Sequence, residues 1–175
     1  VLVGLALELI GTVVIALVLS ATVSAWVIAA PLVVYGLGMG LASAQLTGTV
    51  LRDVPPAESG QGSAAQSTVR QIGSALGTAL SGAALSVALA HTIPSALAGA
   101  GVAGPQVGPL VEATRDSAGG VIDGLRGHAE TDHVAASLSA AFADATRTSL
   151  WVTAVFLVLG VLGATLGWSW IEGLR

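Results

Sequence analysis

Long apolar stretches separated by polar connections dominate this sequence. They predict helices at about 1–20, 27–50 and 63–90, and a last one that starts near 149 and ends in a short tail at 175. Twenty helical residues, at about 1.5 Å each, cross a hydrocarbon core of about 30 Å. Charged residues make up only 9% of the chain, against about 25% in soluble domains. The sequence therefore predicts an all-α polytopic membrane protein whose four transmembrane helices form two hairpins.

The segment 92–148 lies between the last two predicted spans. Its glycine, proline and charged residues make it too polar to cross a bilayer. Val134, Leu138 and Phe142 recur at every fourth position within it. That spacing predicts an amphipathic helix at about 132–148. We expect a long extracytoplasmic loop that is dispensable for folding of the spans, because it has no long apolar run.

Four potential metal ligands lie close together in the same loop: His128, Glu130, Asp132 and His133. No rigid element with a fixed ligand spacing holds them, so solvated loop residues are the favoured interpretation. The chain has no cysteine, which excludes a disulfide framework and a thiolate metal site. We therefore expect neither a bound metal nor a cofactor.

Arginines near the ends of the spans predict an orientation, because cytoplasmic loops of membrane proteins are enriched in basic residues. Arg52, Arg70 and Arg175 lie on the side of the termini. Only Arg147 lies near a span on the other side. We therefore expect a multi-pass protein of the cell membrane with both termini in the cytoplasm and the loop outside.

Small residues follow one face of the helix predicted at 63–90. Gly73, Gly77 and Ser81 are four residues apart, the spacing at which helices in a membrane approach closely. Bulky apolar residues form a separate stripe: Val69, Ile72, Leu76, Leu80 and Val87. We expect other helices to surround this helix and lipid to touch it along the bulky stripe at most.

Three further glycines, Gly36, Gly38 and Gly40, form the motif GLGMGL in the helix predicted at 27–50. A dinucleotide-binding loop requires Gly-x-Gly-x-x-Gly between a strand and a helix. Here Leu41 follows the third glycine, and both flanks are uninterrupted apolar helix. The glycines are therefore interpreted as helix-packing residues.

Glu8, Gln66 and Arg70 are the candidate gating or coupling residues. Glu8 stands within an apolar span, where a carboxylate indicates a functional site because its burial is costly. Alternatively, Glu8 reaches the membrane interface or pairs with a cation of another helix. Gln66 and Arg70 extend the small-residue face toward the cytoplasmic end of its helix. Alternatively, Arg70 extends to a lipid phosphate.

Other function classes have little support in these residues. No nucleophile, base and orienting group converge, so we do not expect an enzyme. The net charge of −4 comes mostly from acidic residues of the outer loop and gives no indication of nucleic-acid binding.

The residues after GLGMGL continue as QLTGTVLRDVPPAESGQGSAAQSTVRQIGSALGTAL. Together these segments resemble the end of the fourteen-span drug:proton antiporters of the major facilitator superfamily, in their actinobacterial form. In that family a glycine-rich span precedes a short cytoplasmic loop with paired prolines, and the next helix carries an Arg-Gln-x-Gly motif. The residues at the family's positions are Gly60, Gly62, Arg70, Gln71, Gly73 and Gly77.

The resemblance implies a C-terminal fragment with the last four of fourteen spans, and a start at Val1 without methionine agrees with it. The whole protein would be a proton-coupled multidrug efflux transporter that works by alternating access and confers antibiotic resistance. Its partners would be membrane lipid, the missing N-terminal helices, protons and an amphipathic small-molecule substrate. The fragment alone is not expected to transport.

A second interpretation, from a different class, stays open. The chain would be a self-standing four-span structural or assembly subunit of the membrane, without a transport cycle. Such a subunit would act through helix packing alone. The coding sequence upstream of Val1 distinguishes the two.

Overall fold

The chain is all-helical throughout the part that its computed structural model describes. The described residues are 1–52, 54–102, 104–128 and 130–173, without the side-chain surroundings of Val50 and of residues 168–173. The α-helices are α1 (Leu2–Val18), α2 (Ala25–Leu51), α3 (Ser59–Gly99), α4 (Val107–Asp116), α5 (Gly120–Leu125) and α6 (Asp132–Gly173). Short 3-10 turns at Pro56–Glu58 and Gly104–Gln106 precede α3 and α4. The all-α prediction is confirmed.

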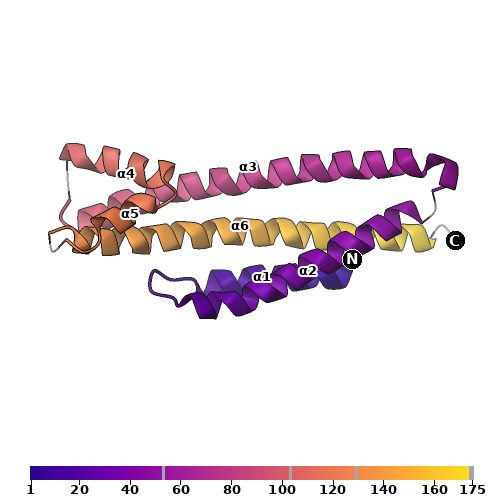
Figure 1. Cartoon of the computed structure of the whole chain (residues 1–175), viewed down its shortest axis with the longest axis horizontal. Coiled ribbons are helices and arrows are strands. Elements are labelled where there is room, and N and C mark those ends of the chain that lie inside the picture. Colours follow the sequence, from indigo (N-terminus) through magenta and orange to yellow (C-terminus); the bar gives the residue numbers. More distant parts are fainter. Residues whose placement is uncertain (53, 103, 129, 174–175) are drawn as a thin grey trace.

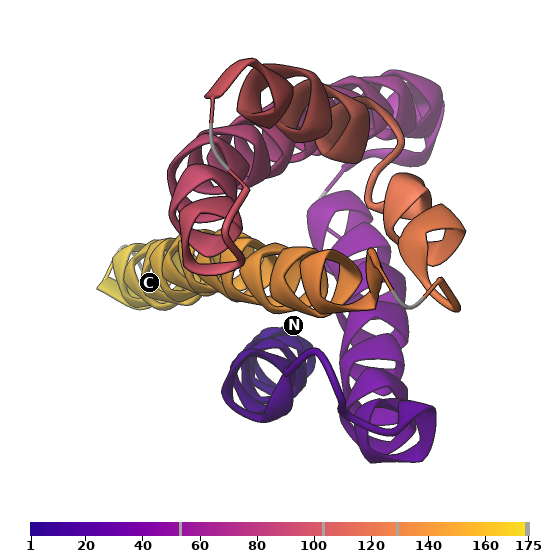
Figure 2. The ribbon, with the colours of Figure 1, turned by 90° about the vertical axis from the view of Figure 1, so that its left-hand side faces the viewer.

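Helix α6 is the central element of the fold. It packs against α3 on one side and against α1 on the other, and α1 pairs in turn with α2 (Figure 1). The turn between α1 and α2 lies toward the end that carries α4 and α5, whereas the N- and C-terminal ends lie away from that end (Figure 1). Seen along the long axis, α2 diverges from α1 and crosses toward the start of α3 (Figure 2).

In the part of the chain that the structure describes, three helical stretches are long and apolar enough to cross a membrane: Ala25–Thr49, Pro56–Gly99 and Asp132–Gly167. Helix α1 is equally apolar but has only 17 residues. These helices suggest a membrane-embedded protein, in agreement with the predicted class. A fourth span at α1, and the side of the membrane on which each end lies, stay predictions.

Helices α3 and α6 are both longer than a bilayer is thick. With 41 and 42 residues they extend about 60 Å, against a hydrocarbon core of about 30 Å. The amphipathic helix expected at 132–148 and the last predicted span form one helix, because no glycine or proline separates them. Helix α3 continues through Pro94, where a break was expected near 91. Ile93 and Leu97, both fully buried, hold this last part of α3 against its neighbours.

The main hydrophobic core lies at the end of the molecule formed by α4, α5 and the parts of α3 and α6 that they contact. We call this region, residues 85–102, 107–125 and 132–146, the helical cap. Its core side chains include Leu89, Ile93, Leu97, Ile122, Val134 and Leu138. The predicted apolar face of 132–148 is confirmed, since Val134 and Leu138 are buried and Phe142 packs against the same core.

Within the described residues, the segment 92–148 is largely helical and contributes to a buried core, where a loop was expected. Its dispensability for folding of the spans stays a prediction. The expectation was based on the absence of a long apolar run. Short apolar groups on four helical segments instead converge into one core, which a hydropathy profile does not detect because they are far apart in sequence.

Gly119 makes the sharp turn between α4 and α5 possible. Its φ of +88° lies in the left-handed region that glycine tolerates. A Cβ at this position would lie 3.2 Å from the Phe142 ring, so the turn also packs closely on α6. The turn thereby brings α5 back onto the core.

Candidate functional site

Helices α1 and α2 touch backbone to backbone along a seam of small residues. A Cβ placed on Gly4 would lie 2.5 Å from the backbone nitrogen of Ala42. One placed on Gly38 would lie 2.6 Å from both the Gly4 carbonyl oxygen and the Glu8 nitrogen. Such approach is possible only without side chains at these positions, which is how helices pack closely in membranes. Gly38 is therefore placed in a helix contact, as predicted for the motif GLGMGL.

Glu8 lies directly at this seam. Its Cγ would be 3.0 Å from a Cβ on Gly38, and its side chain is partly buried. The Thr12 hydroxyl donates to the Glu8 backbone carbonyl at 2.8 Å, and not to the carboxylate. Among the described residues, no donor or cation is paired with the Glu8 carboxylate. Such a group can take up and release a proton.

The other two candidate polar residues lie elsewhere. Gln66 donates through Nε2 to the Thr47 hydroxyl at 3.1 Å and so connects the start of α3 to the end of α2. Arg70 is exposed on α3 and forms no ion pair within the described part of the chain. Neither residue is bonded to Glu8, so the three candidates do not form one cluster.

Four of the predicted packing glycines face open space. A Cβ on Gly36, Gly40, Gly73 or Gly77 would meet nothing within 4 Å. Residues two apart on a helix point to nearly opposite sides, which is why Gly38 contacts α1 while Gly36 and Gly40 do not. Among the described residues, no helix packs closely on Gly36 and Gly40 of α2 or on Gly73 and Gly77 of α3.

Ser81 is the point where the small-residue face of α3 meets α6. The Ser149 hydroxyl donates to the Ser81 carbonyl at 3.0 Å, and the Ser81 and Thr153 hydroxyls lie 3.3 Å apart. Beside these bonds runs an open groove of about 610 Å³ between the two helices. Its lining residues are Ser74, Gly77, Thr78, Ser81, Gly82, Leu85, Ser149, Thr153 and Phe156. The groove offers hydroxyl groups on an otherwise apolar surface.

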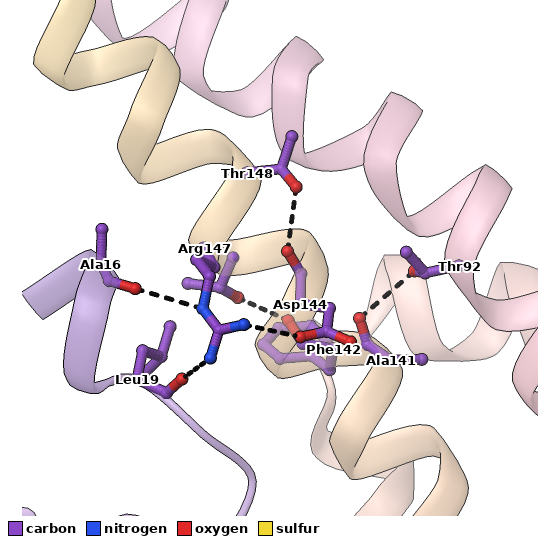
Figure 3. Close-up of polar contacts among 9 residues, drawn as sticks. Ala16, Leu19, Thr92, Ala141, Phe142, Asp144, Arg147 and Thr148 are labelled. Atoms are coloured by element: carbon purple, nitrogen blue, oxygen red, sulfur yellow. Dashed lines mark hydrogen bonds and ion pairs between the residues drawn. The ribbon is translucent and has the colours of Figure 1, made fainter.

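Arg147 joins α6 to the end of α1 (Figure 3). Its Nε donates to the Ala16 carbonyl at 3.1 Å, and its Nη2 donates to the Leu19 carbonyl. Asp144, one turn earlier on α6, holds Nη1 at 3.3 Å. On the neighbouring turn, the Thr92 hydroxyl of α3 donates to the Ala141 carbonyl at 3.2 Å. Three helices are thus tied together at the level where the apolar part of α6 begins.

A cleft of about 470 Å³ opens beside this junction, between the α1–α2 turn and the helical cap. Leu19 and Ala21 line one side, and Gly119, Arg126 and Phe142 line the other. Arg126 is paired with Asp123 at 3.3 Å and donates to the Ser139 hydroxyl at 3.0 Å. The α1–α2 turn therefore borders an open space on this side.

The proteins compared with this chain add no family assignment. No family model, curated protein or solved structure matches it. The candidate site is accordingly defined by geometry: a partly buried carboxylate at a glycine seam, an open hydroxyl-lined groove, and an arginine that links α6 to α1.

The role of Arg147 is the main feature that sequence reasoning missed. The position of Arg147 in the sequence predicted only the orientation of the spans in the membrane. Asp144 at i−3 was a local signal for an ion pair, but the acceptors on α1 are 131 and 128 residues away in sequence. The spacing of residues in the sequence does not predict a contact between positions so far apart.

Proposed function

We propose that this chain is the C-terminal part of a proton-coupled multidrug efflux transporter that works by alternating access. In this proposal α1, α2, α3 and α6 are its last four spans. Both termini are cytoplasmic and the helical cap lies outside the cell membrane. The fragment alone does not transport, because the preceding helices are part of the pathway.

The observation that carries the proposal is the pair of small-residue helix faces that this chain leaves open. Gly73 and Gly77 on α3, and Gly36 and Gly40 on α2, have space for a Cβ and more. In a bilayer, small residues favour helix association because backbones approach closely, whereas lipid gains nothing from a glycine. Faces of this kind are expected where further helices of the same protein pack.

Glu8 supplies the group that proton coupling requires. A carboxylate that alternates between a protonated and an ionised state cannot be held in a fixed ion pair, because that pair would have to break each time a proton binds. Glu8 meets this condition among the described residues. Gly38, which has no side chain, lets it lie directly against α2. Gln66 and Arg70, near the connection between α2 and α3, are the proposed cytoplasmic gating residues.

The upstream coding sequence provides the simplest test. A transporter requires an in-frame extension with about ten further apolar runs of about twenty residues each. A start codon directly before Val1 would contradict the proposal. The decisive measurement is efflux of an amphipathic drug, with counterflow of protons, by vesicles that contain the full-length protein.

The alternative is a self-standing four-span structural or assembly subunit. Two observations favour it: the core of the helical cap and the link from Arg147 to α1 both join helices of this chain to one another. Absence of drug efflux from a chain with no upstream extension would support this alternative.

A further inference from the structure

The end of α1 needs hydrogen-bond donors that its own helix cannot supply. The last carbonyl groups of any α-helix lack an intrahelical N–H partner. Directly after α1 the Leu19 amide donates to the Ile15 carbonyl at 2.9 Å, and the carbonyls of Ala16 and Leu19 face Arg147 (Figure 3). No basic residue lies in the last turn of α1. The positive charge that suits a helix C-terminus comes instead from α6, as Arg147.

The geometry of Arg147 suits this task. The planar guanidinium has several N–H donors in a fixed fork, so a single side chain can bind two carbonyls and a carboxylate at once. Here Nε and Nη2 bind the two carbonyls, while Nη1 binds Asp144. The Arg147 side chain is partly buried, and its bonds to Ala16 and Leu19 place it between α6 and the end of α1.

We propose that Arg147 is a latch that fixes the end of α1 against α6 and thereby sets the position of Glu8 along the seam with α2. Asp144 orients the latch. Because α1 is one continuous helix of 17 residues, an anchor at its last turn also fixes the position of Glu8 along the helix axis. The consequence for proton coupling rests on the proposed function, whereas the latch itself does not.

A merely interfacial arginine would behave differently. Such a residue extends toward lipid phosphate and can be replaced by lysine, which reaches the interface equally well. A latch cannot be replaced in this way, because the single ammonium of lysine does not bind both carbonyls and Asp144 in one plane. Arg147→Lys therefore separates the two roles.

Hydrogen–deuterium exchange on the full-length protein in lipid nanodiscs tests the latch. In Arg147→Gln we expect amides of residues 17–24 to exchange roughly tenfold faster or more, because charge-assisted bonds that hold the turn are lost. Arg147→Lys should also accelerate exchange there. Arg126→Gln is the matched control, since Arg126 forms the same i−3 ion pair but, among the described residues, binds Asp123 and Ser139 rather than α1. Exchange of residues 17–24 should stay unchanged in that variant.

Parent-like exchange of residues 17–24 in Arg147→Gln, or full restoration by Arg147→Lys, would overturn the proposal. If Arg147→Gln gives no folded protein, Asp144→Asn takes its place. Faster exchange of residues 17–24 in that variant supports the latch, and parent-like exchange overturns it. Drug efflux is measured separately, so faster exchange in a protein without efflux contradicts only the proposed function.

Discussion

Gly38 of α2 lies so close to Glu8 of α1 that a single methyl group does not fit between them. A Cβ on Gly38 would be 2.6 Å from the Glu8 backbone nitrogen, well inside van der Waals contact. The one acidic residue of α1 thus lies at a point where the two helices approach closely through a glycine. Gly38 therefore affects both where Glu8 lies and how closely α1 and α2 pack.

The first prediction concerns that contact. Gly38→Ala should push α1 and α2 apart and destabilise the protein by about 1–3 kcal/mol, the usual range for overpacking. Gly48→Ala is the matched control, because it lies in the same helix, has nothing within 4 Å and is not one of the glycines proposed to face further helices. Thermal unfolding of the full-length protein in detergent measures both. Equal melting temperatures for the two variants would contradict a backbone contact at Gly38.

A second prediction concerns the open glycine face of α3. Gly77→Leu should abolish drug resistance or folding of the full-length protein, because helices from outside this chain would contact that face. Leu80→Val, on the bulky stripe and already 45% exposed, should have little effect on either. Resistance assays and detergent stability are the measurements. If Gly77→Leu behaves like the parent, no helix packs on these glycines and the proposed larger bundle loses its main support.

A third prediction concerns proton coupling. Glu8→Gln keeps the size of the side chain but removes its ability to ionise, so drug-driven proton release should fall while expression stays intact. Glu112→Gln, an exposed carboxylate of α4, serves as the control and should leave proton release unchanged. Proton flux in vesicles with the full-length protein gives the result. Undiminished coupling in Glu8→Gln would assign Glu8 a structural or interfacial role.

The helical cap leads to a fourth prediction. Leu138 is fully buried in its core, so Leu138→Ala should cost about 2–5 kcal/mol and lower the melting temperature. Leu162→Ala, on the same helix but 51% exposed, should cost much less because lipid or detergent fills the space. Unfolding in detergent compares the pair. A tolerated Leu138→Ala would contradict a stabilising core in the helical cap and favour the prediction that this segment is dispensable.

The sequence by itself determined the class of the protein. Apolar length and low charge indicate membrane helices because each transmembrane residue contributes to transfer from water independently of its distant neighbours. Local periodicity also predicted the apolar face of 132–148, and Val134 and Leu138 are indeed buried. These properties depend on residues within a few turns of one another.

Only the tertiary structure decided which of these residues meet. Spacing marked Gly36, Gly38 and Gly40 alike, yet a neighbouring helix contacts Gly38 alone, since a contact depends on where that helix lies. The core of the helical cap and the bonds from Arg147 to Ala16 and Leu19 likewise join segments far apart in the chain. Such contacts arise from the packing of whole helices, and no local pattern encodes which distant carbonyl an arginine will reach.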